Sequence, residues 1–341
     1  MNIVKEGARN WFMNVIRGNI GIISVLIILF IALSLMSPVF LTYNNIMTVL
    51  NQISINTIIA IGMTFVIILA GIDLSVGAIV AMSGTLTVGF MVSMGMPVLL
   101  AIPIGLALGA IIGFINGTVV NKFRLHSFIV TLATMNIARG IAYVYSGGQA
   151  ERVTDSSYTI IATGKVFGII PLPVVYMFIL LIIFSMILNN TKFGTYTYAI
   201  GGNREAARFS GVPIKKVEVT IYMFAGLLAA FAGIILSAKM YSGQPSVGDG
   251  YELDAIAACV LGGTSLYGGR GSISGTFFGA MVIGIISNGM NLLALNSFWQ
   301  LIVKGVIIMI AIIIDSQKEG QSKLSLNIFK RNKQLKKRGT S

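Results

Sequence analysis

The chain has 341 residues, of which 55% are hydrophobic and only 10% are charged. Soluble domains carry about 25% charged residues, so this composition excludes a soluble globular protein and indicates a polytopic membrane protein. The net charge of +13 does not indicate a nucleic-acid partner. Most of the 24 Lys and Arg residues fall in short connections and in the tail, where they mark the cytoplasmic side of a membrane.

We expect an all-α fold of about ten transmembrane helices, some of them interrupted by glycine-containing segments. The predicted organisation is a cytoplasmic interfacial lead-in (1–19), a transmembrane domain (20–316) and a basic cytoplasmic tail (317–341). In chain order the expected spans are 20–36, 47–70, a run ending at 94, 98–120, 128–145, 172–188, 219–238, a broken segment after 254, a span ending near 295, and 298–314. Residues 147–170 and 241–254 are predicted to lie outside the cell.

Small residues in one span predict close helix packing. Glycines recur at four-residue spacing, a pattern that lets helix backbones approach each other; they are Gly105, Gly109, Gly113 and Gly117. The only cysteine, Cys259, lies in apolar surroundings, which favours a packing role.

Two apolar runs are interrupted in a similar way. The sequence Leu-Ala-Gly-Ile-Asp-Leu-Ser begins at Leu69, and Leu-Gly-Gly-Thr-Ser-Leu begins at Leu261. Such paired interruptions in transporters point to the transport pathway. The candidate residues for the pathway or for helix breaks are Gly71, Asp73, Ser75, Gly77, Gly262, Gly263, Thr264 and Ser265.

Ionisable residues within the spans are few. Asp73 either caps the following helix, by accepting N–H bonds near Ser75, or binds a coupling ion; we favour the cap. Arg139 and Lys304 are expected to extend toward the membrane surface, with Asp254 or Glu252 as alternative partners for Lys304.

The sequence predicts no enzyme activity, no metal site and no cofactor. His126 is the only histidine, and no cluster of cysteines or carboxylates compensates. The glycine-rich stretches lack the Gly-Lys-Ser/Thr of a P-loop, so any ATP would be bound by another chain.

A polar loop, 192–218, separates two very apolar segments and carries a basic surplus, which predicts a cytoplasmic position. Within it we expect a short helix that begins at an Asn cap and is stopped by Gly-Val-Pro. Such a helix is either a plain solvated loop helix or a docking element for another protein. The candidate coupling residues are Asn203, Glu205, Ala206, Ala207, Arg208 and Gly211.

These motifs resemble those of the ribose-type sugar permeases of ABC importers. The loop has their Glu-Ala-Ala-x-x-x-Gly pattern from Glu205 to Gly211, and residues 70–77 read Ala-Gly-Ile-Asp-Leu-Ser-Val-Gly. Residues 128–132, Phe-Ile-Val-Thr-Leu, and residues 252–265 are also similar. Where that family usually has Pro-Pro, this chain has His126 and Ser127.

The resemblance implies a membrane-spanning permease subunit that moves a monosaccharide into the cytoplasm. Its expected partners are a cytoplasmic ABC ATPase, an extracytoplasmic sugar-binding protein and a second permease subunit, in a homodimer within the bacterial cytoplasmic (inner) membrane. The alternatives are an ion-coupled secondary transporter, or an ABC permease for another small solute such as an amino acid or a nucleoside.

Overall fold

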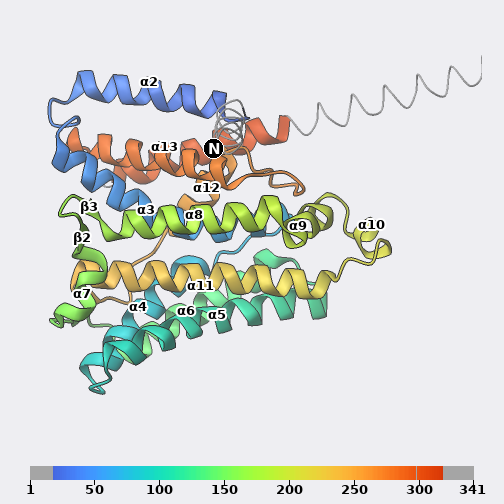
Figure 1. The fold of residues 1–341 in the computed structure, drawn as a ribbon, viewed down its shortest axis with the longest axis horizontal. Coiled ribbons are helices and arrows are strands. Elements are labelled where there is room, and N and C mark those ends of the chain that lie inside the picture. The colour runs from blue at the N-terminus through green and yellow to red at the C-terminus, as the bar shows by residue number, and fades with distance from the viewer. Residues whose placement is uncertain (1–17, 297, 318–341) are drawn as a thin grey trace, which may run out of the picture.

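The computed structural model describes residues 18–296 and 298–317, and this part of the chain forms a bundle of helices that run along one common direction (Figure 1). The predicted lead-in and basic tail lie outside the described residues, apart from residues 18, 19 and 317. Described helices occupy most of the chain, as the all-α prediction requires.

The first half of the bundle agrees closely with the predicted spans. Its helices are α2 (Ile20–Met36), α3 (Tyr43–Ile68), α4 (Val76–Val92), α5 (Val98–Phe123) and α6 (Ser127–Ser146). The bounds of α2 coincide with the first predicted span. The others differ by a few residues at their ends, where propensity and polarity give weak signals.

The second half begins with a small element of short strands and one short helix, which are β1 (Glu151–Arg152), α7 (Ser156–Thr163), β2 (Lys165–Val166) and β3 (Ile170–Pro171). It continues through α8 (Leu172–Asn190), α9 (Lys192–Gly202), α10 (Arg204–Phe209), α11 (Ile214–Met240), β4 (Ser242–Gly243), α12 (Tyr251–Leu261) and α13 (Ile273–Leu292). A last helix spans Phe298–Gln317. The pair β1–β4 is antiparallel and places Glu151 opposite Gly243; β2 and β3 form a second antiparallel pair.

Figure 1 shows α9 and α10 at one end of the bundle and α7, β2 and β3 at the other. We call the first of these the α10 end. We call the second the β1 end, because β1 pairs with β4, and β4 follows directly after the C-terminal end of α11, which lies opposite α10. Within the described residues, seven helices are long and apolar enough to cross a membrane, and α2 and α4 are shorter apolar helices of 17 residues. The chain is therefore a multi-pass membrane protein, and the number of ten spans stays a prediction.

The centre of the bundle is formed by α3, α4, α11 and α13. In the most apolar stretch of α3, 83% of the residues are buried, against 6% in the last helix. Buried polar residues on α3 bond to its neighbours: the Thr64 hydroxyl lies 2.7 Å from that of Thr276 on α13, and the Asn45 amide donates to Asn288 Oδ1 at 3.1 Å. These bonds satisfy polar groups that would be costly in an apolar environment.

The glycine stripe of α5 packs directly on α11, as predicted. A Cβ at Gly113 would lie 2.8 Å from the carbonyl carbon of Tyr222 and 2.9 Å from Met223 Cα, and one at Gly117 would lie 2.7 Å from Val219 Cα. Because backbone atoms cannot move aside like the end of a flexible side chain, any larger residue would push the two helices apart.

We therefore expect Gly113→Val to destabilise the folded protein by about 1–3 kcal/mol, the usual cost of overpacking. The measurement is the thermal midpoint and the monodisperse fraction of the detergent-solubilised chain. Gly140→Val on α6 is the matched control, because no atom lies within 4 Å of a Cβ built there. An equal loss in both variants would mean that helix propensity, and not packing on α11, accounts for the effect.

Candidate functional site

The predicted short helix is present as α10, with the predicted start and stop signals. The Asn203 side chain accepts a hydrogen bond from the Ala206 N–H at 2.9 Å, as an N-cap does. At the other end, Gly211 has a φ of 77°, and the Val212 N–H donates to the Ala207 carbonyl at 3.1 Å. This left-handed residue closes the helix, and glycine adopts that conformation without strain.

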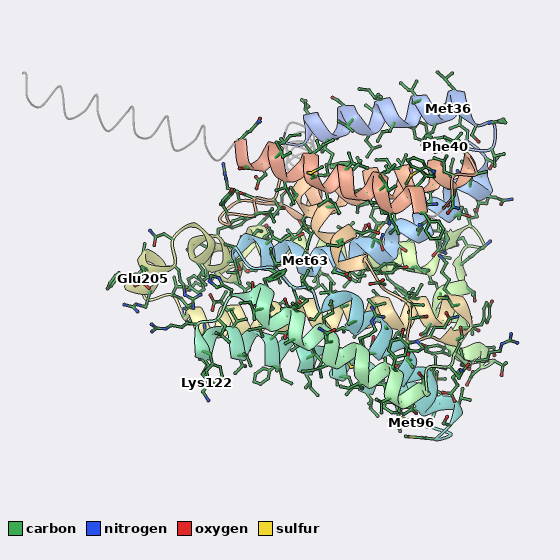
Figure 2. The ribbon with its side chains drawn as sticks, turned by 180° about the vertical axis from the view of Figure 1, so that it is seen from behind. Met36, Phe40, Met63, Met96, Lys122 and Glu205 are labelled. Carbon is green, nitrogen blue, oxygen red and sulfur yellow. The ribbon has the colours of Figure 1, made fainter. Side chains whose placement is uncertain are left out.

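The surface of α10 is exposed and projects from its end of the bundle (Figures 1 and 2). Of its six residues, only Ala207 is buried, whereas the Phe209 side chain is 81% exposed. Glu205 and Arg208 form an exposed ion pair at 3.3 Å. The exposed Phe209 ring and the Arg208 guanidinium belong to residue types that are enriched at protein interfaces.

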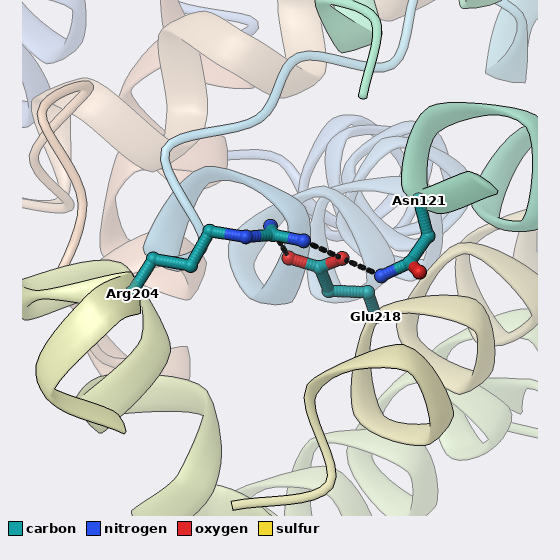
Figure 3. Close-up of polar contacts among 3 residues, drawn as sticks. All are labelled: Asn121, Arg204 and Glu218. Carbon is teal, nitrogen blue, oxygen red and sulfur yellow. Dashed lines mark hydrogen bonds and ion pairs between the residues drawn. The ribbon is translucent and has the colours of Figure 1, made fainter. Parts of the chain in front are cut away.

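An ion pair between half-exposed Arg204 and buried Glu218 fixes α10 to the rest of the bundle (Figure 3). The Arg204 guanidinium donates to both carboxylate oxygens of Glu218 on α11, with Nη2 to Oε2 at 3.1 Å. The Asn121 amide on α5 donates to the same Oε2 at 2.5 Å. The Glu218 side chain is only 5% exposed, so this carboxylate depends on these two donors in place of water.

The helix α9, which precedes α10, connects this end to both interruptions of the chain. Sequence reasoning treated its residues as loop and missed it. The Tyr198 hydroxyl donates to the Gly271 carbonyl at 2.8 Å, and burial raises the pKa of this tyrosine, so the donor proton is retained. A Cβ at Gly201 would overlap the Ile68 carbonyl oxygen and would lie 2.7 Å from the Gly269 nitrogen.

The two interruptions lie side by side. The first, residues 69–75, joins α3 to α4, and the second, residues 262–272, joins α12 to α13. The Gly269 N–H donates to the Ile68 carbonyl at 2.8 Å, although the two residues are 201 positions apart in the sequence. The similar sequences of the two breaks therefore meet in space, and α9 contacts the second break and Ile68, the residue just before the first.

In the first break, Asp73 is fully buried and organises the turn. Its Oδ1 accepts from the Ser75 N–H at 2.9 Å and from the Ser75 hydroxyl at 2.6 Å. Asn116 on α5 donates to the same hydroxyl at 2.9 Å. This geometry agrees with the favoured interpretation of Asp73 as a residue that accepts backbone N–H bonds at the start of α4.

Two hydroxyl residues on α6 complete the first break, and sequence reasoning gave them no role. Ser127 Oγ accepts from the Ile72 N–H at 2.9 Å, and Thr131 Oγ1 accepts from the Leu74 N–H at 3.1 Å. The available signal was their spacing of four residues, which puts both hydroxyls on one helix face. Ser127 thus supplies an acceptor where the resembled family usually has proline.

Hydrogen bonds to α12 and to the last helix hold the second break. The Thr264 N–H donates to the Cys259 carbonyl at 2.9 Å, and both Thr264 and Ser265 are buried. Asp315, which sequence reasoning did not single out, accepts from the Leu266 N–H at 3.0 Å. The predicted glycines make close backbone contacts here and in the first break: Gly262 lies against Gly275, and Gly77 lies against Gly248.

The charged residues of the spans have specific partners. Lys304 Nζ lies 2.7 Å from Asp254 Oδ2, one of the two partners considered from the sequence. Arg139 does not extend toward the membrane surface. Its Nη1 donates to the carbonyls of Pro245, at 2.9 Å, and Val247, at 2.5 Å.

No cluster of three or more His, Cys, Asp or Glu side chains suited to a metal ion occurs among the residues that the structure describes. The fold and the site instead define a polytopic membrane protein in which α9 links the exposed helix α10 to two adjacent helix breaks.

The comparisons with known proteins identify the class. The chain belongs to the family described as the permease component of branched-chain amino acid transport systems. The model of this family matches residues 45–312. Within it, the chain belongs with the ribose-type monosaccharide permeases of ABC transporters. It is 48% identical over 294 residues to the ribose import permease protein of Bacillus subtilis, an alignment that covers 86% of this chain and 91% of that protein.

Other relatives agree. The ribose import permease protein of Escherichia coli K12 is 43% identical over 298 residues, covering 86% of this chain and 92% of the relative. The L-arabinose transport system permease protein of the same organism is 41% identical over 299 residues, covering 88% and 90%. No solved structure matches the chain. An ABC import permease works, in general, with an ATPase and a binding protein.

Proposed function

We propose that this chain is the permease subunit that imports a pentose or a similar monosaccharide, such as ribose, xylose or galactose, into the bacterial cytoplasm. The ribose and arabinose permeases named above support the substrate class. The observation that carries the mechanism is the connection of exposed α10 through α9 to both helix breaks. A force applied to α10 thereby reaches the middle of the membrane domain.

The proposal assigns the α10 end to the cytoplasm. Basic residues cluster there, and cytoplasmic connections of membrane proteins carry an excess of Lys and Arg. A groove of about 720 Å³ beside α10 is lined by basic side chains that include Lys122, Arg124 and Lys215. Both termini are then cytoplasmic, and the β1 end faces the sugar-binding protein. The membrane is the bacterial inner membrane.

The proposed partners divide the work. A separate ATPase docks on α10, through Glu205, Ala206, Arg208 and the surface around Gly211, and a second copy of this chain completes the permease as a homodimer. ATP binding in the ATPase moves α10, and α9 transmits the displacement to the breaks at Gly71–Gly77 and Gly262–Ser265. The breaks act as hinges between inward-open and outward-open states.

The test replaces two residues of the docking helix. Glu205→Arg reverses an exposed charge, and Gly211→Val places a β-branched residue at a φ of 77°, which costs about 1–2 kcal/mol locally. Both variants should insert normally but lose at least tenfold in ribose uptake and in ATPase stimulation by the loaded binding protein. Lys216→Ala, another exposed charge near the same end, is the control. Normal stimulation in both variants would contradict the coupling role.

The two alternatives have distinct outcomes. Ribose uptake by vesicles that contain this chain alone, and its loss on addition of an ionophore, would establish a secondary transporter. Uptake of a branched-chain amino acid instead of a sugar by the full complex would match the wider family description. The sugar relatives favour neither outcome.

A further inference from the structure

The chain between β4 and α12 does not stay at the β1 end. Gly243 packs against Thr85 and Val88 of α4, and Gly248 packs against Gly77 and Val80. Gly77 is the second residue of α4, and the 15 residues that follow it run about 23 Å to the helix end at Val92. Residues 244–250, which we call the re-entrant segment, therefore descend along α4 deep into the bundle.

The position of α4 relative to the β1 end is fixed by a hydrogen bond. The Ser93 hydroxyl, just after α4, donates to Glu151 Oε1 of β1 at 2.5 Å. From the other side, Arg139 binds the re-entrant segment through the carbonyls of Pro245 and Val247. Arg139 lies 12 residues after the start of α6, or about 18 Å along a helix of about 30 Å. The segment thus reaches the middle depth of the membrane domain.

The re-entrant segment is not helical, and it exposes polar side chains at this depth. Ser246 and Asp249 are exposed, although their neighbours Pro245 and Gly248 are buried. On α6, Asn136 is also exposed and lies three residues before Arg139, on an adjoining part of the helix surface. Irregular backbone at membrane depth occurs only inside protein or along a water-filled cavity, and an exposed carboxylate facing lipid is strongly unfavourable.

We propose that Asn136, Ser246 and Asp249 line the aqueous sugar pathway, on the surface that the re-entrant segment and α6 form together. This inference rests on the proposed function and extends it to the residues that meet the solute. A neutral sugar is hydrogen-bonded to water through its hydroxyl groups. An amide, a hydroxyl and a carboxylate along the pathway can replace those hydrogen bonds as the sugar passes. Ile137, the next residue of α6, points about 100° away from Asn136 around the helix and serves as the comparison position.

The position of α12 supports the same surface. This half-helix starts at Tyr251, directly after the re-entrant segment, and ends at the second break, which α9 contacts. Half-helices that begin near the membrane midplane form substrate sites in several transporter folds. Movement of the second break by α9 is therefore transmitted along α12 to the lining residues.

The experiment uses single cysteines in the assembled complex, in membranes. The native Cys259 is fully buried, so the unmodified chain serves as the unreactive background. We expect Ser246→Cys and Asp249→Cys to react with a charged, membrane-impermeant thiosulfonate at least tenfold faster than Ile137→Cys, whose parent side chain is 55% exposed at a similar depth. The reagent reacts with the thiolate form of cysteine, which forms in water and not in lipid. The difference in labelling rate therefore reports access to water.

Reaction of both cysteines at the slow rate of Ile137→Cys, with and without ATP, would overturn the proposal, because the surface would then be covered by lipid or by a second subunit. Equally fast reaction of all three would also overturn it. The labelling does not depend on which solute is carried. Fast labelling in a complex that imports none of ribose, xylose, arabinose and galactose would leave the pathway in place and refute the substrate class instead.

Discussion

Arg204→Ala is expected to uncouple the permease from its ATPase and to destabilise the α10 end by about 1–3 kcal/mol. The substitution leaves the Glu218 carboxylate buried with Asn121 as its remaining donor, and removal of one partner from a buried ion pair is costly. The estimate is below the full cost of such a loss, because the Arg204 side chain is 49% exposed and water screens part of the interaction.

The matched control for the stability part of this prediction is Arg208→Ala, one turn further along α10. Its ion pair with Glu205 is exposed on both sides, and such pairs contribute between 0 and about 1 kcal/mol. The thermal midpoint should separate the two variants. The neutral pair Arg204→Gln with Glu218→Gln should recover stability, since no buried charge remains unpaired. Failure of the double variant to recover, or equal midpoints for the two alanine variants, would show that the ion pair does not hold α10.

Asp254→Ala is expected to have a comparable effect deeper in the membrane domain. Lys304 lies on the last helix, and its partner on α12 is 2.7 Å away. A lysine without a counter-charge in the middle of a membrane helix costs about 2.5–3.5 kcal/mol. We expect the variant to accumulate poorly in the membrane and to lose its last helix to proteolysis, measured as the yield of full-length chain after limited digestion.

The double variant Asp254→Ala with Lys304→Met supplies the test of this mechanism. It removes the unpaired charge and keeps an apolar side chain of similar length, so the yield should return to within about twofold of the starting chain. If Asp254→Ala alone accumulates normally, the ion pair does not anchor the last helix. A double variant as poor as the single one would instead assign Asp254 a structural role independent of Lys304.

The helices of this protein were largely predictable from its sequence, because long apolar runs bounded by Pro, Gly and basic residues are unambiguous. The cap at Asn203 and the stop at Gly211 were predictable for the same local reason. The helix α9 was not, because Thr, Tyr and Gly dominate it and its stability comes from contacts with distant segments. The number of spans remains a prediction, since α12 is too short to cross a membrane alone.

Most contacts between side chains and distant parts of the chain could not be predicted from the sequence. The partners of Glu218, Arg139 and Asp315 lie between 14 and 108 positions away, and no periodic pattern links them. The pair of Lys304 with Asp254 was anticipated, because few charges within the spans leave few choices. The assignment of Gly71, Asp73 and the second break to the transport route remains a prediction. Gly71, Asp73, Thr264 and Ser265 are buried, unlike the exposed residues of the re-entrant segment.

The placement of Gly201 against both Ile68 and Gly269 has a consequence for how the halves of the chain move. A single backbone position touches the two segments, so neither can shift without disturbing the other. Under the proposed coupling, we therefore expect a displacement of α9 to move both segments together. Each ATPase cycle would then act on both breaks at once, which limits leakage of solute between cycles.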